Sequence, residues 1–452
     1  MRRISLRQSG FYALLGLAVP LALTGLAQSI VFFFETLFLA HLGADILAAG
    51  ALVSWLFGTL VVIIYGTLSS INVLVSHQYG AKDYRGIALV TRDGLWLTLL
   101  LSIPTFILCW NTAPIFLAFG QTPEIVLLAN AYFHALAWGV LPDFLLIALF
   151  EFIMGLGYAR TIMVITLLSV PITLFFSYAF IFGAFGMPRM GIAGAGWGMS
   201  ISYWLTLFIL LAYIAINKDY RRYFQFLFYF RTPSFLWDLL RIGVPTGVMY
   251  SIEVAFFFAL TLVLGSMGSQ LLVANQITLQ YLNVMIAIIF SISQAITVRM
   301  GHLLGSGQIV AAKRVNATGL LLSGGLMGLV AIFYIFFPDA LIQMDFDVHD
   351  PQNAQIVLYA KQLFGICALF QIVEALRISL FGSLRGLKDT HFPLLISTLS
   401  YWVIALPGGY ILATRYHMGG AGLWWGMLVG ASIAVPLLYL RFKMLIKRNS
   451  NA

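Results

Sequence analysis

The stretch GVMYSIEVAFFFALTL, residues 247–262, is apolar almost throughout but carries a carboxylic acid, Glu253, near its centre. Apolar runs of about 20 residues are typical of transmembrane helices, whereas the strands of a membrane barrel are about 10 residues long and alternate strictly. Similar long runs recur along the chain, for example LLIALFEFIMGLGY at residues 145–158. The stretch therefore indicates an all-α integral membrane protein.

The composition of the whole chain supports a membrane protein. Of its 452 residues, 61% are hydrophobic and only 9% are charged, whereas an ordinary soluble domain carries about 25% charged residues. We expect twelve transmembrane helices, near residues 11–40, 48–75, 90–112, 125–150, 160–183, 192–216, 241–265, 272–298, 315–338, 356–383, 392–414 and 421–445.

The distribution of Lys and Arg predicts the orientation, because basic residues are enriched in cytoplasmic loops. With the N-terminus inside, only Arg189, Lys361 and Arg415 of the 25 basic residues fall outside, and Arg377 lies within a span. We therefore expect a multi-pass protein of the bacterial inner membrane with both termini cytoplasmic. This topology accounts for the net charge of +9, so no nucleic-acid partner is needed to explain it.

The second half of the chain repeats the first. A shift of 225 residues brings VFFFETLFLAHLG (31–43) onto FFFALTLVLGSMG (256–268) and Pro20 onto Pro245. A shift of 228 brings MGIAGAGWGM (190–199) onto MGGAGLWWGM (418–427). We expect two six-helix bundles, residues 1–216 and 241–452, joined by a cytoplasmic linker at 217–240. Parallel repeats are related by a pseudo-two-fold axis along the membrane normal, and the substrate path then lies between the halves.

Acids inside the predicted spans are the strongest functional candidates, because a charge at mid-bilayer costs about 2.5–3.5 kcal/mol. Glu253, Glu374, Glu35 and Asp143 all lie within spans. Burial raises the pKa of a carboxyl group, so such a group can hold a proton and release it near a competing cation. We expect coupling to H⁺ or Na⁺ at the three glutamates, with Glu253 and Glu374 as Na⁺ ligands. Alternatively, Arg377 neutralises Glu374 from one helical turn away, and the backbone holds Glu35 and Asp143.

Aromatic side chains flank two of these acids. Three rings lie three or four residues from Glu253, and another stands one turn before Glu374. Aromatic faces attract organic cations, although such rings also fill membrane cores. The predicted substrate cavity consists of these rings and two polar neighbours: Tyr250, Phe256, Phe257, Phe370, Gln28 and Asp143.

Motifs of enzymes and of ATP-driven pumps are absent from the sequence. The chain has no G-x-x-x-x-G-K-[ST] phosphate loop, and no spacing of a nucleophile and a base supports hydrolysis. We expect a protein that is not an enzyme, needs no cofactor besides its coupling ion, and draws energy from an ion gradient.

Three motifs and the duplicated twelve-span pattern resemble the multidrug and toxic compound extrusion (MATE) family, especially its bacterial NorM-like branch. The motifs are Pro20 followed by Glu35 and HLG, VPTGVMYSIEVAFF (244–257), and FQIVEALRISLFGSLRGLKDT (370–390). The resemblance implies export of organic cations in exchange for Na⁺ or H⁺. It also implies that Glu253 and Glu374 are the cation-binding acids of the C-terminal bundle and Glu35 that of the N-terminal bundle.

The chain departs from this family at the candidate site. The family more usually has Asp where Glu35 and Glu374 stand, and often Tyr where Phe370 stands. A lipid-linked or metabolite flippase of the wider superfamily is the main alternative, and a membrane-embedded enzyme or scaffold is a further one. Because the interior charges are mostly acidic, cationic cargo is favoured. We expect small organic cations and membrane lipid as partners of a monomer.

Overall fold

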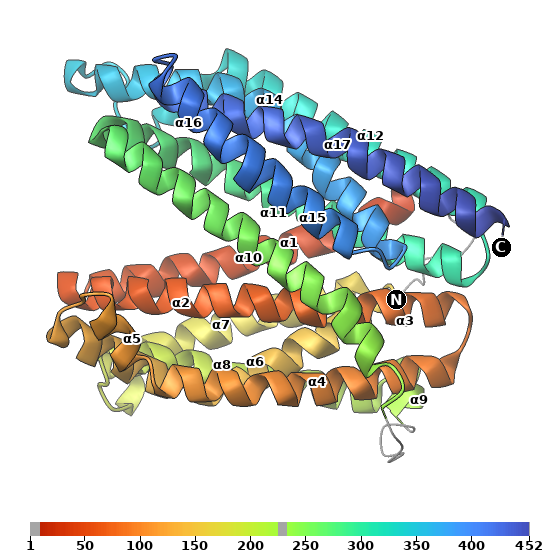
Figure 1. Cartoon of the computed structure of the whole chain (residues 1–452). Coiled ribbons are helices and arrows are strands. Elements are labelled where there is room, and N and C mark those ends of the chain that lie inside the picture. The colour runs from red at the N-terminus through yellow and green to blue at the C-terminus, as the bar shows by residue number, and fades with distance from the viewer. Residues whose placement is uncertain (1–9, 225–232, 452) are drawn as a thin grey trace. The chain divides into compact units, whose positions relative to one another are not determined.

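The structure is a computed structural model that describes residues 10–224 and 233–451. All regular secondary structure in these residues is helical, and twelve spans are long and apolar enough to cross a membrane (Figure 1). The predicted all-α fold with twelve spans is confirmed. Part of the predicted linker at 217–240, residues 225–232, lies outside the described residues.

The first of two compact units comprises Val19–Gly247. After the end of α1 (Phe11–Ala40), its helices are α2 (Ala44–Leu68), α3 (Ser70–Gly80), α4 (Tyr84–Trp110), α5 (Ala113–Ala118), α6 (Pro123–Gly155), α7 (Ala159–Phe182), η1 (Ala184–Gly186), α8 (Ile192–Ile216) and α9 (Lys218–Phe224). Within this unit α6 is the central helix, because it packs against α2, α4 and α8 and is the most buried of the spans.

The second compact unit comprises Met1–Ala18 and Val248–Ala452. It contains most of α10 (Leu236–Met267), then α11 (Ser269–Gly305), α12 (Ile309–Phe336), α13 (Pro338–Ile342), η2 (Pro351–Asn353), α14 (Ala354–Gly386), α15 (His391–Thr398), η3 (Leu399–Ala405), α16 (Leu406–Thr414) and α17 (Gly419–Asn451). Here α14 is central and packs against α11, α12 and α17. Helices α1 and α10 each contribute to both units.

The repeated glycine motif brings helix backbones into contact in both units. A Cβ on Gly198 of α8 would lie 2.5 Å from the Cα of Ser177 in α7. A Cβ on Gly426 of α17 would lie 2.5 Å from the carbonyl oxygen of Ala405. Only glycine permits these approaches, since real Cβ contacts are not this short. The motif therefore fixes where α7 and the α15–η3–α16 segment lie beside their neighbours.

A π-helix, η3, interrupts the eleventh span between α15 and α16. Such segments break the α-helical hydrogen-bond ladder and are frequent at functional sites. The backbone of η3 is covered by α17, where a Cβ on Gly430 would lie 2.4 Å from the carbonyl oxygen of Ser400. Two residues of this segment, Tyr401 and Trp402, lie at the candidate functional site.

Candidate functional site

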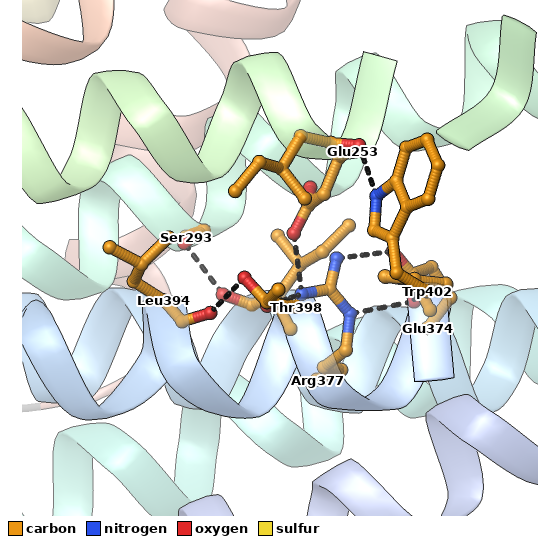
Figure 2. Close-up of polar contacts among 11 residues, drawn as sticks. Glu253, Ser293, Glu374, Arg377, Leu394, Thr398 and Trp402 are labelled. Carbon is orange, nitrogen blue, oxygen red and sulfur yellow. Dashed lines mark hydrogen bonds and ion pairs between the residues drawn. The ribbon is translucent and has the colours of Figure 1, made fainter. Parts of the chain in front are cut away.

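Arg377 of α14 lies between the two glutamates predicted for the C-terminal bundle (Figure 2). Its Nε and Nη2 donate to Glu374 Oε2 and Oε1 at 2.8 and 2.6 Å. Its Nη1 donates to Glu253 Oε1 at 2.8 Å. The pairing of Arg377 with Glu374, which the sequence left as an alternative, is present in the structure, and the same guanidinium also holds Glu253 from α10.

Two hydroxyl groups complete this arrangement. Arg377 Nη1 also donates to Ser397 Oγ at 2.9 Å, and the Tyr401 hydroxyl donates to Glu374 Oε2 at 2.6 Å. The guanidinium carbon lies 5.1 Å from the centre of the Tyr401 ring, within the range of a cation–π contact. We call Glu253, Glu374, Arg377, Ser397 and Tyr401 the acid–arginine cluster.

Two consecutive side chains of the π-helix η3 form hydrogen bonds to two different helices. Tyr401 reaches Glu374 on α14, and Trp402 Nε1 donates to the carbonyl oxygen of Ile252 on α10 at 3.1 Å. Ile252 directly precedes Glu253, and the Phe256 ring lies 4.7 Å from that of Tyr401. The segment therefore links both acid-bearing helices.

The acid–arginine cluster is buried and carries an odd number of charges. The side chains of Arg377 and Glu374 are 2% and 4% exposed, whereas that of Glu253 is 11% exposed. With both carboxyls ionised, two negative charges face one positive charge, which leaves one negative charge in a medium that penalises it. One further positive charge would neutralise the cluster, and Glu253 is the member most open to receive it.

Glu35 on α1 has a different environment in the other unit. Its side chain is buried and one carboxyl oxygen accepts a hydrogen bond from Ser177 of α7. The other oxygen, Oε2, is buried without a hydrogen-bond partner among the described residues. Tyr132 of α6 and Tyr203 of α8 lie close enough to interact with Glu35 electrostatically. The hydrogen-bond partner given to this acid is the hydroxyl group of Ser177.

Asp143 of α6 belongs to the same polar region of that unit, since it interacts electrostatically with Tyr203. The aspartate is half-buried. Tyr203 is thus within electrostatic range of both Asp143 and Glu35, which lie 108 positions apart along the chain by their residue numbers. Sequence reasoning found both acids but not Tyr203.

The residues predicted to line a substrate cavity occupy several environments. Phe256 and Phe370 are fully buried, and Phe370 packs edge-on against Trp424. Phe257 is half-buried and Gln28 is exposed. Tyr250 is buried against Phe290 and Phe381, and its hydroxyl accepts a 3.3 Å hydrogen bond from Arg385. Their assignment to a cavity stays a prediction.

One buried amide near the cluster is left without a partner. Gln371 lies one turn before Glu374 on α14 and is 2% exposed, yet neither its oxygen nor its nitrogen has a hydrogen-bond partner among the described residues. Buried polar groups of this kind are commonly satisfied by ordered water.

In residues 10–224 and 233–451, no three His, Cys, Asp or Glu side chains gather as possible metal ligands.

Comparison with known proteins assigns the family. The MatE family model matches residues 20–179 and 245–411, which is most of the chain. The chain belongs to the MatE family. MatE proteins are membrane transporters, so the resemblance noted in the sequence is confirmed, and the protein is a multi-pass membrane transporter that handles small molecules.

Curated MatE relatives support this assignment over nearly the full length. The chain is 35% identical over 427 residues to the probable multidrug resistance protein NorM of Burkholderia mallei, covering 94% of this chain and 91% of that protein. It is 33% identical over 429 residues to the multidrug resistance protein NorM of Burkholderia vietnamiensis, covering 95% and 92%.

Solved MatE structures share the fold. One, a MATE in the bent conformation, has a TM-score of 0.89 at 19% identity and covers 99% of this chain and 97% of its own. Another, a multidrug resistance MATE family transporter in an outward-facing conformation, has a TM-score of 0.86 at 19% identity and covers 97% and 96%. At this identity the likeness concerns the MatE fold alone.

Proposed function

We propose that the protein is a multidrug efflux transporter that exports small organic cations in exchange for H⁺ by alternating access. The negative charge left over in the acid–arginine cluster carries this proposal. A single positive charge restores neutrality there, whether it comes from a proton, a sodium ion or a cationic drug. Cations that neutralise the same negative charge cannot occupy the cluster together. Such competition between the coupling ion and the drug is what exchange requires.

The arrangement of Arg377 favours H⁺ over Na⁺ as the coupling ion. Its guanidinium already bonds to both carboxylates, through Nη1 to Glu253 and through Nε and Nη2 to Glu374. A sodium ion shared by the two acids would have to displace it. A proton needs only one carboxyl oxygen, and Glu253 is the more exposed acid. We therefore assign the exchange of the proton to Glu253.

Glu35 is proposed as a second coupling acid. It is buried, and its Oε2 has no hydrogen-bond partner among the described residues. An unpaired carboxylate oxygen at this depth is costly, so a proton or cation at this position is strongly favoured. Asp143 and Tyr203 extend the same polar region.

Efflux of ethidium from proteoliposomes tests the function and the ion together. A pH gradient imposed without Na⁺ should drive efflux, whereas a Na⁺ gradient at equal pH should not. Glu253→Gln should abolish the efflux, while Glu124→Gln, at an exposed acid in the first turn of α6, should leave it intact. Equal efflux by Glu253→Gln and the unmodified protein would sink the assignment.

The same assay separates this proposal from a flippase. If neither ethidium nor any other cationic dye is bound or exported under either gradient, the lipid-linked or metabolite flippase becomes the better interpretation. We further propose that both termini face the cytoplasm of a bacterial inner membrane. Accessibility of single cysteines placed near Arg189 and Lys447 to a membrane-impermeant thiol reagent tests this, because only the first should be labelled from outside.

A further inference from the structure

Arg377 is bound in the acid–arginine cluster in the way that a ligand is bound. Four hydrogen bonds of 2.6–2.9 Å hold its guanidinium, three to carboxylate oxygens and one to Ser397. Its carbon lies 5.1 Å from the centre of the Tyr401 ring. Two acids, a hydroxyl acceptor and an aromatic face constitute a receptor for a planar cation rich in N–H donors.

The guanidinium is nevertheless tethered to the protein, which makes it a competitor for any free cation. A group on a short tether acts at an effective concentration of roughly millimolar or more. A free cation must exceed this to displace it, and a cation without N–H donors forgoes the charge-assisted hydrogen bonds that Arg377 makes. The cluster thus discriminates among cations by their donors as well as by their charge.

We propose that Arg377 occupies a binding site for guanidinium and amidinium groups, and that cations bearing such a group bind by taking its place between Glu253 and Glu374. This rests on the proposed function, since it names the class of cation that the exchange site prefers. Displacement proceeds from the side of Glu253, whose side chain is the most exposed of the three charged members. Arg377 returns to the acids when the ligand leaves, so they are not left unpaired.

Two probes of similar size separate this proposal from simple charge recognition. Benzamidinium carries planar N–H donors, whereas benzyltrimethylammonium has the same ring and charge but none. The binding of each to purified protein is measured by calorimetry for the unmodified chain, Arg377→Ala, Arg377→Lys and Glu253→Gln. Arg415→Ala serves as a control at an exposed arginine.

Removal of the tethered competitor should increase the affinity for benzamidinium. We expect Arg377→Ala to bind it at least tenfold more tightly than the unmodified chain, and Arg377→Lys to lie between the two. Benzyltrimethylammonium should also bind more tightly, because Arg377 competes with any free cation, but its gain should be at least threefold smaller than that of benzamidinium, since it cannot form the charge-assisted hydrogen bonds. Glu253→Gln should weaken benzamidinium binding about tenfold or more, as expected for the loss of a charge-assisted hydrogen bond, and Arg415→Ala should match the unmodified chain.

Methylguanidinium provides a second measurement if Arg377→Ala is poorly stable. It should raise the unfolding temperature of Arg377→Ala by several degrees and that of the unmodified chain by much less, whereas tetramethylammonium should stabilise Arg377→Ala less than methylguanidinium does. Equal or weaker benzamidinium binding by both Arg377 variants, with no stabilisation by methylguanidinium, would overturn the proposal while leaving ethidium export intact. Conversely, the expected binding without any cation export would overturn the proposed function and retain this site.

Discussion

Removing the carboxylate of Glu253 and removing the guanidinium of Arg377 should have very unequal consequences for stability. Glu253→Gln leaves Arg377 and Glu374 as a neutral pair joined by two hydrogen bonds. The new amide oxygen can still accept from Arg377 Nη1 in place of the carboxylate. Arg377→Gln instead leaves two buried carboxylates facing each other without their shared cation.

The structure sets the size of each effect. Removing one partner of a buried ion pair costs about 3–5 kcal/mol, because the other charge stays buried and uncompensated. We expect Arg377→Gln to lose this amount. Glu253→Gln keeps a hydrogen bond of ordinary strength and removes the excess charge, so its free energy of unfolding should change by about 1 kcal/mol or less.

Unfolding of the purified variants in detergent, followed by tryptophan fluorescence, measures both changes. The double variant Glu253→Gln, Arg377→Gln retains one carboxylate, so it should be more stable than Arg377→Gln alone. Pairwise coupling of about 0.5–3 kcal/mol is typical for residues in one such network. If Arg377→Gln is as stable as the unmodified chain, or if Glu253→Gln loses as much stability as Arg377→Gln, the ion-balance reasoning is wrong.

Three further predictions concern the supports of the two acid sites. Tyr401→Phe removes the hydroxyl that donates to a carboxylate but keeps the ring, so it should weaken the site by about 1.5–3 kcal/mol and slow ethidium efflux at least tenfold without unfolding the protein. Gly426→Ala should destabilise the chain by about 1–3 kcal/mol through helix overpacking, whereas Gly325→Ala on α12, where a Cβ would meet nothing within 4 Å, should be neutral or slightly stabilising. Glu35→Gln should abolish pH-driven efflux, and Ser177→Ala should slow it, if Glu35 is a coupling acid; efflux at the unmodified rate in both variants would remove Glu35 from the mechanism.

The sequence predicted the spans and the acids because each has a strong physical signature. A stretch of some 20 apolar residues has few uses outside a bilayer, and all twelve expected segments correspond to spans in the structure. An acid within such a stretch is expensive, which identified Glu253 and Glu374. The family resemblance added the same residues independently.

The partners of those acids could not be predicted, because their signatures are weak. Ser397 and Tyr401 are single hydroxyls in apolar sequence, where serine and tyrosine are common. Tyr401 lies in the π-helix η3, and no rule of helical spacing reveals an irregular turn in advance. The bond between Arg377 and Glu253 joins residues 124 positions apart, whereas helical spacing relates Arg377 only to Glu374. Phe370 was predicted to line a cavity because it stands one turn before Glu374. In the structure its ring packs edge-on against Trp424 in the core.

The two halves of the duplicated chain compensate their acids in different ways, and this difference bears on exchange. In the register of the repeat, Gln28 aligns with Glu253 and Glu35 with Leu260, so neither acid has an acidic counterpart. Glu253 has the tethered cation Arg377, whereas Glu35 accepts from the neutral hydroxyl of Ser177. On the proposed mechanism, the acids of the C-terminal half can release a ligand as Arg377 closes on them again. Glu35 has no such substitute among its described contacts, so its ligand can leave only when another cation or a proton replaces it. On this proposal, release at Glu35 therefore requires an incoming ion, in addition to the proton exchange assigned to Glu253.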